Sequence, residues 1–350
     1  MSASCRVKTR TSSSVNSMLA SRATASTSAR VKATGMANAS PKACDGATVR
    51  GTLVPLSPVR KAAVAGRWYP ERGRDLTAAV DAHLSSADAA VSGAGASAQA
   101  SELHEIVAII APHAGLMYSG AVAAHAYRQL RGRPIEVAVL VGPSHFEGFD
   151  GVAMYASGAF ATPLGPVAID DGCAAAVMAQ LPLAHDRPSV HAREHSLEMQ
   201  LPFLRRVLPD ARIVPILVGW QTADTALALG GALASAVRSR RAIIVASSDL
   251  SHYHDAATAA RLDGIVIECV RRFDPDALQQ SLDRNPEHAC GGGAMVAAMR
   301  AARALGADRA AILDYADSGD VSGDKTAVVG YLAAALGRRS TPSSERGLPG

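Results

Sequence analysis

Four short runs of the chain are almost continuously apolar and rich in β-branched residues, and each has the length of a strand. They are EIVAII (105–110), EVAVLV (136–141), ARIVPILV (211–218) and AIIVAS (242–247). Strands covered on both faces show such runs, whereas strands with one wet face alternate apolar and polar positions. We therefore expect these four strands to be parallel and central in one sheet. A last strand is predicted at 326–336, where a closing helix is the alternative.

Segments of helical character lie between these runs. They are 120–130, 173–181, 197–208, 225–240, 256–273 and 293–305. In 197–208, leucines recur at three- and four-residue spacing, which is typical of a helix with one buried face. The alternation of strands and helices predicts an α/β fold: a single domain with a mostly parallel central sheet and helices on both faces.

The two ends of the chain differ in composition from the middle. Residues 1–59 are basic and rich in Ser, Thr and Ala, and they contain no aromatic residue. They also lack the central apolar stretch that a secretory signal peptide requires. We predict a disordered extension at 1–59, a folded domain at 60–338 and a disordered tail at 339–350. A transit peptide, or a true start at Met36, are open alternatives for the first segment. The Ala/Ser/Gly-rich stretch 85–101 is predicted to be a flexible loop.

Charge and cysteine content exclude several classes of function. The formal net charge is +4, but residues 1–60 carry nine Lys/Arg against one Asp, whereas residues 61–338 carry 24 Lys/Arg against 29 Asp/Glu. A nucleic-acid partner is therefore not expected of the folded domain. No apolar run is long enough for a membrane span. Five scattered cysteines favour free thiols in a reducing compartment, so we expect a cytoplasmic protein.

Metal-competent side chains follow three of the predicted strands. His113 follows the first, His145 the second, and Asp249 with His252 the fourth. The carboxyl ends of parallel strands line one crevice, and neutral imidazole is a common ligand of transition metals. Taken singly, these residues fit purely structural roles: the histidines can be loop residues that cap helices, and the aspartate can be a helix N-cap. Their repeated placement favours a shared pocket.

Two further residues stand at the starts of predicted helices. His195 lies at the start of the segment 197–208, where the helix dipole favours a neutral imidazole that can serve as a general base or hydrogen-bond donor. A first-turn residue without chemistry is the alternative. Cys290 precedes the helix at 293–305, and a helix N-terminus lowers the pKa of a thiol. Cys290 is thus the candidate reactive or metal-binding cysteine, while Cys269 is expected in the core. The glycines 291–293 lack the Lys-Ser/Thr of a phosphate loop.

Seven motifs, taken in order, resemble those of the Memo family, and more narrowly those of the bacterial AmmeMemoRadiSam system B proteins. They are RKAAVAGRWYP (60–70), APHAGLMYSG (111–120), GPSHF (142–146), EHSLEMQLPFL (194–204), SSDLSHY (247–253), ACGGG (289–293) and YADSGDVSGDKTAVVGYLA (315–333). The resemblance extends over about residues 60–338. It implies a fold similar to that of the LigB-type class III extradiol dioxygenases.

The resemblance also implies roles for the residues that match. It assigns metal binding to His113, His145 and Cys290, and it places Asp249 and His252 beside them as catalytic residues. The EHS motif makes His195 the counterpart of the acid/base histidine of the dioxygenases. A cysteine replaces their metal-binding glutamate, which gives a softer ligand set that suits Fe(II), with copper or zinc as alternatives. Glu287 is an alternative carboxylate ligand, and Gly-Gly-Gly-Ala after Cys290 predicts a looser loop than in relatives.

Two functions remain open at this point. The first is a non-haem metal-binding protein, most simply an iron protein, with a redox or oxygenase role. The second is a non-catalytic adaptor that binds a peptide or a metabolite in the same pocket, as the resemblance to eukaryotic Memo implies. The family name also implies AMME-domain and radical SAM proteins as partners, in addition to a small-molecule or peptide ligand.

Overall fold

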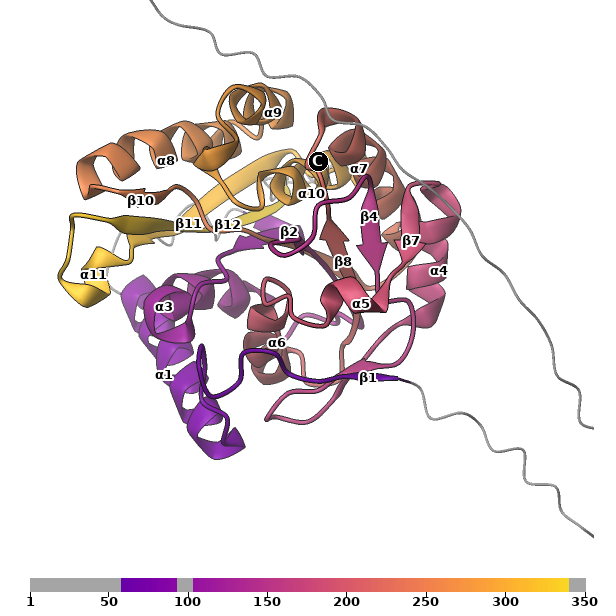
Figure 1. Cartoon of the computed structure of the whole chain (residues 1–350), viewed down its shortest axis with the longest axis horizontal. Helices are drawn as coiled ribbons and strands as arrows, with labels where there is room; N and C mark the ends of the chain where they lie inside the picture. The colour runs from indigo at the N-terminus through magenta and orange to yellow at the C-terminus, as the bar shows by residue number, and fades with distance from the viewer. Residues whose placement is uncertain (1–57, 93–102, 340–350) are drawn as a thin grey trace, which may run out of the picture. The chain divides into compact units, whose positions relative to one another are not determined.

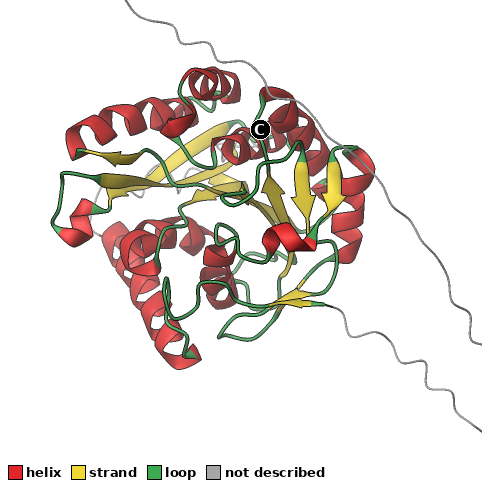
Figure 2. Ribbon diagram, viewed as in Figure 1, coloured by secondary structure: helices red, strands yellow, loops and turns green. Residues whose placement is uncertain are grey.

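A nine-stranded sheet runs through the computed structural model, which describes residues 58–92 and 103–339. Its strands are β2 (Leu103–Ala111), β3 (Val137–Pro143), β4 (Val152–Met154), β7 (Ala184–Asp186), β8 (Arg212–Val218), β9 (Ala242–Ser247), β10 (His252–His254), β11 (Arg309–Asp317) and β12 (Val328–Arg339). The order is β10-β12-β2-β9-β3-β8-β4-β7, with β11 paired to β12. Within it β2, β9, β3 and β8 pair in parallel, which confirms the four central strands predicted from the apolar runs. Figure 2 shows strands of the sheet with helices on either side of them.

Antiparallel pairings flank the four parallel strands on both sides, and the edge strand β7 pairs in parallel with β4. β12 runs antiparallel to β2 on one side, and β4 runs antiparallel to β8 on the other. Most of the segment 326–336 belongs to the long strand β12, as predicted. The alternative of a closing helix is wrong. A small separate sheet joins β1 (Val59–Arg60), β5 (Ala159–Phe160) and β6 (Val167–Ala168). β1 thus begins at Val59, one residue before the predicted start of the domain at residue 60. Of the residues predicted to be disordered at the two ends of the chain, 1–57 and 340–350 lie outside the described residues.

The helices are α1 (Gly73–Ser92), α3 (Leu116–Tyr127), α4 (Asp171–Gln180), α5 (Pro188–His191), α6 (Leu201–Val207), α7 (Ala223–Val237), α8 (Ala256–Arg271), α9 (Pro275–Arg284), α10 (Gly292–Ala304) and α11 (Gly319–Ser322), with 3₁₀ turns η1 (Arg128–Leu130), η2 (Glu198–Gln200) and η3 (Pro286–His288). Six helices match the six predicted segments with shifted ends, namely α3, α4, α6, α7, α8 and α10, whereas α1, α5, α9 and α11 were not predicted. The loop predicted at 85–101 is wrong for 85–92, which continue α1, because alanine favours a helix; residues 93–101 are not described. No helix in the described ranges is long and apolar enough to cross a bilayer.

Alternate residues of the central strands face two separate hydrophobic cores. In β3, Val137, Val139 and Val141 belong to one core, and Ala138 and Leu140 to the other. Side chains from α4, α7, α8, α9 and α10 complete the first core, and side chains from α1, α3 and α6 complete the second (Figure 1). This period of two explains why the strand sequences are apolar throughout: both faces of the sheet are covered.

Candidate metal centre

The strand order brings the predicted site residues together. β9 lies between β2 and β3, so the loops after these three strands are neighbours at one edge of the sheet. A cavity of about 570 Å³ opens there. Its lining includes every predicted site residue, namely His113, His145, His195, Asp249, His252, Glu287 and Cys290. Predicted site residues up to 177 positions apart in sequence, His113 and Cys290, therefore line one cavity.

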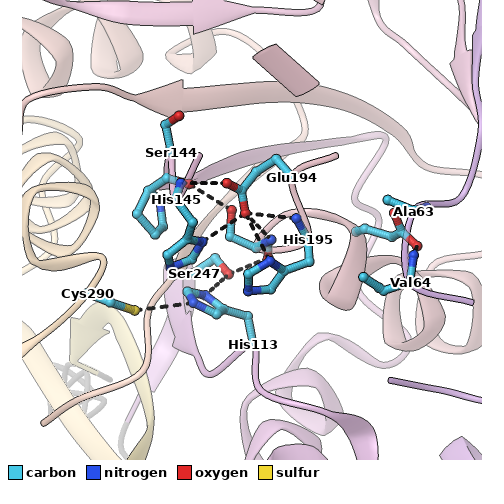
Figure 3. Close-up of polar contacts among 12 residues, drawn as sticks. Ala63, Val64, His113, Ser144, His145, Glu194, His195, Ser247 and Cys290 are labelled. Atoms are coloured by element: carbon cyan, nitrogen blue, oxygen red, sulfur yellow. Dashed lines mark hydrogen bonds and ion pairs between the residues drawn. The ribbon is translucent and has the colours of Figure 1, made fainter. Parts of the chain in front are cut away.

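Three histidines form the centre of this cavity. His113, His145 and His195 each offer a ligand atom, and these atoms lie within 4.8 Å of one another. The rings of His145 and His195 stack with centroids 4.5 Å apart, and the His113 ring stands edge-on to both (Figure 3). Cys290 lies beside the group, with its Sγ 3.2 Å from His113 Nε2. The structure thus groups His195 with the two histidines predicted as ligands, and it places the predicted cysteine against one of them.

Hydrogen bonds around Ser247 determine the tautomer of His113. The Ser247 hydroxyl donates its only hydrogen to the carbonyl of Ser196, and it accepts from Gln200 Nε2. His113 Nδ1, 2.9 Å away, must therefore be the donor to Ser247 Oγ. The Gln200 amide is oriented by a second bond from Nε2 to the carbonyl of Pro112. His113 consequently turns an unprotonated Nε2 toward the cavity.

Glu194 determines the tautomer of His145 in the same way. This buried carboxylate accepts a hydrogen bond from His145 Nδ1 at 2.9 Å and others from the backbone amides of His145, His195 and Ser196. Burial alone would raise the pKa of Glu194, but the His145 hydrogen bond and charge, with the backbone amides, hold that pKa well below its usual range. A charged carboxylate accepts the Nδ1–H hydrogen bond, so the neutral tautomer of His145 carries its lone pair on Nε2. Sequence reasoning missed this role, because its only signal was the adjacency of Glu194 to His195.

The other imidazoles are held neutral chiefly by burial. Burial, with the nearby His145 and His195 charges, lowers the pKa of His113 well below its usual value. Burial lowers the pKa of His195 to about 4 and lowers that of His252 as well. His252 donates from Nδ1 to the carbonyl of Leu250 at 2.8 Å, so its Nε2 also carries a lone pair. His195 is neutral as predicted, but it lies in a loop before η2, and the cause is burial rather than a helix dipole.

The thiol pKa of Cys290 is shifted in the direction opposite to the one predicted from its position before a helix. Burial, with the charge of Asp249 adding to it, raises the pKa of the Cys290 thiol far above its usual value. The loop that carries Cys290 packs tightly rather than loosely, because a Cβ at Gly291 would lie 2.4 Å from the carbonyl oxygen of Ser247. Glycine here lets the cysteine loop approach the end of β9.

The three described cysteines, Cys173, Cys269 and Cys290, are free thiols as expected.

Asp249 fixes the backbone of the first histidine rather than its ring. Its Oδ1 accepts hydrogen bonds from the amides of His113 and Ala114, at 2.7 and 3.3 Å. Burial raises the pKa of Asp249 to about 7. The predicted neighbour of the metal ligands is therefore a positioning residue for the His113 loop.

Comparison with known proteins places this site in a family. The family model "Memo-like protein" matches residues 60–335. A MEMO1 family protein of Methanosarcina mazei is 37% identical over 278 residues, which cover 79% of this chain and 98% of that protein. MEMO1 family proteins of Nitrosopumilus maritimus and Thermotoga petrophila are 34% and 36% identical, with 79% of this chain covered in each case and 98% and 99% of theirs.

Proposed function

This chain belongs to the family of Memo-like proteins, and on that premise we propose that its cavity binds one transition-metal ion through His113, His145 and a third ligand, Cys290 or His195. The convergence of three imidazoles, with ligand atoms within 4.8 Å of one another, supports the proposal. Two of these rings have Nδ1 engaged by Ser247 and Glu194. Metal-binding histidines are typically oriented by such a hydrogen bond on the second ring nitrogen.

The donor atoms favour some metals over others. Imidazole nitrogen and thiolate sulfur suit iron, copper and zinc, whereas calcium and magnesium require oxygen ligands. We propose Fe(II), with copper or zinc as competitors for the same residues. When bound, such an ion polarises an oxygen donor of the ligand, and iron or copper also exchanges an electron. The raised pKa of Cys290 means that its thiol would give up a proton on metal binding.

An open cavity next to the histidines supports a redox or oxygenase role over a structural one. Structural metal sites are closed by protein ligands, whereas catalytic sites keep a position for substrate. Here the three histidines line a cavity of about 570 Å³. In this role, His252 is a neutral base on the cavity wall, and its free Nε2 accepts a proton from a bound hydroxyl group. His195 is a second base when Cys290 is the third ligand.

Metal analysis of the full chain tests the proposal. Protein purified without oxygen should hold about one ion of iron, copper or zinc per chain after dialysis, and spectroscopy should identify nitrogen or sulfur ligands. The oxygenase role is tested by oxygen uptake of the iron-loaded protein with a panel of catechols, with metal-free protein as the control. A protein that retains no metal when iron, copper and zinc are each offered in excess contradicts the proposal.

The Glu194→Gln substitution should weaken metal binding by about 10- to 100-fold. The glutamine amide offers one acceptor oxygen in place of two, so it cannot accept from His145 Nδ1 and from the three backbone amides that now bond the carboxylate. Unfolding free energy should also fall, by about 1–3 kcal/mol, because a buried donor is left without an acceptor. Competition with a chromophoric chelator measures the affinity. Glu147→Gln is the matched control, since Glu147 lies two residues from His145 but pairs with Arg187; equal affinities in the two variants would refute the role of Glu194.

A further inference from the structure

A second cavity adjoins the candidate metal centre. It has a volume of about 470 Å³, and it shares four lining residues with the first cavity, namely Trp68, Ala114, Tyr253 and Val329. From these shared walls it extends to the start of α3, at Met117 and Tyr118, and to the segment around α11. The two cavities are therefore neighbouring compartments, with Trp68 and Tyr253 at their junction.

The walls of the second cavity are rich in exposed aromatic and apolar side chains. Met117 is 64% exposed, Tyr118 37% and Tyr253 78%, although each is a large hydrophobic residue. Of the ten large hydrophobic residues exposed in the described part of the chain, four line one or both cavities, with Phe146 as the fourth. Such a concentration of exposed apolar surface marks a site of contact with a ligand. Arg67 and Asp324 also line the cavity with opposite charges, so it favours a neutral occupant.

Tyr253 is held at the junction by an unfavourable backbone conformation. Its φ is 63°, a value that non-glycine residues rarely adopt. The pairing of β10 with β12 shifts register between His252 and His254, so Tyr253 is the irregular residue between them. A bulge of this kind turns one side chain away from its strand. Here it directs the tyrosine to both cavities, while the neighbouring His252 lines only the first.

We propose that the two cavities bind a single elongated organic ligand. An oxygen-donor head occupies the histidine cavity, and a neutral, flat aromatic tail occupies the second cavity against Tyr118 and Tyr253. The position of the head rests on the proposed metal site, whereas the position of the tail rests on the second cavity alone. The tail therefore determines specificity, and residues of the second cavity that do not touch the head control it.

Intrinsic fluorescence gives a direct measure of occupancy. The chain contains two tryptophans, so Trp220→Phe leaves Trp68, which lines both cavities, as the only tryptophan, and its emission is excited selectively over that of the tyrosines. On this background, zinc-loaded protein is titrated with acetohydroxamate as the head alone, and with ω-phenylalkyl hydroxamates of increasing linker length. Metal-free protein is titrated with 4-phenylbutanol as the tail alone. We expect the best phenylalkyl hydroxamate to bind at least about tenfold more tightly than acetohydroxamate.

One substitution separates the tail from the head. Ala327 is exposed and lines only the second cavity, so Ala327→Phe should fill that cavity and abolish the tenfold gain, with the affinity for acetohydroxamate unchanged. Ala260→Phe, on an exposed position of α8 outside both cavities, is the matched control and should keep the gain. A gain that is absent at every linker length, or that survives in Ala327→Phe, overturns the proposal.

The proposed function and this inference fail in different ways. Protein that takes up no zinc, or zinc-loaded protein that ignores acetohydroxamate, refutes the metal site. In that case the tail-only titration decides the inference: quenching of Trp68 by 4-phenylbutanol that is lost in Ala327→Phe supports the second cavity, and the absence of quenching sinks it.

Discussion

A variant that combines His113→Ala with Cys290→Ser should lose stoichiometric metal. His113 Nε2 and Cys290 Sγ lie 3.2 Å apart at the same side of the cavity, so the double substitution removes both donors there. His145 and His195 remain, and two imidazoles without a third protein ligand hold a transition metal weakly. Elemental analysis after anaerobic purification and dialysis should give the background level. Retention of about one ion per chain would disprove the proposed ligand set.

Single substitutions identify the third ligand. If Cys290 binds the metal, Cys290→Ser should lower the affinity strongly and His195→Ala only slightly; if His195 binds it, the order reverses. His252→Ala is the matched control, because His252 lines the same cavity but lies outside the three-histidine group. Circular dichroism of every variant checks the fold. A His252→Ala protein that loses metal together with the others would show that the assay reports damage to the cavity rather than loss of a ligand.

The strands and the convergence of the site were predictable from local sequence, because both follow from short-range patterns. Continuous apolar runs predicted four strands, and they are the four parallel strands at the centre of the sheet. Polar residues just after these runs had to lie at the carboxyl edge of the sheet. His113, His145 and Asp249 accordingly line one cavity. The insertion of β9 between β2 and β3 brings them closer than sequence order suggests, because strand order depends on long-range packing.

The residues that orient the ligands were not predictable, because their partners are remote in sequence. Glu194 binds His145 across 49 residues, and Ser247 binds His113 across 134. Ser247 ends an apolar strand and Gln200 lies in an apolar helix segment, so neither had a distinct signal. The pKa of Cys290 was predicted in the wrong direction for the same reason. Position before a helix is readable from sequence, but burial beside Asp249 is set by tertiary packing and outweighs it.

Loss of the buried ion pair between Arg60 and Glu198 should cost more stability than any surface pair. Arg60 donates to Glu198 Oε2 at 2.5 Å and to the carbonyls of His191 and Glu194 at 2.7 and 2.5 Å. Both side chains of the ion pair are almost fully buried. This network ties the segment that carries Trp68 to the segment that carries His195, whose rings lie 4.2 Å apart. It therefore holds one wall of the cavity against the candidate metal centre.

Arg60→Met should lower the free energy of unfolding by about 3–5 kcal/mol, because it leaves the Glu198 carboxylate buried without a cation. Glu198 would keep three donors, the amides of Ala63 and Val64 and the hydroxyl of Tyr69. The double variant Arg60→Met with Glu198→Gln should be more stable than Arg60→Met alone, since the amide oxygen still accepts hydrogen bonds but no charge is buried. Urea unfolding followed by circular dichroism measures the unmodified protein, the single variants Arg60→Met and Glu198→Gln, and the double variant.

An exposed ion pair provides the comparison for this prediction. Arg206 makes two hydrogen bonds to Asp81, at 2.8 Å each, but these side chains are 37% and 43% exposed. Arg206→Met should therefore cost less than about 1 kcal/mol, because water already screens the pair. If Arg60→Met costs as little as Arg206→Met, or if the Arg60 and Glu198 substitutions are simply additive, the buried network does not hold the Trp68 segment. In that event the contact between Trp68 and His195 would have to rest on the backbone hydrogen bond from Leu116 to the Trp68 carbonyl and on local packing.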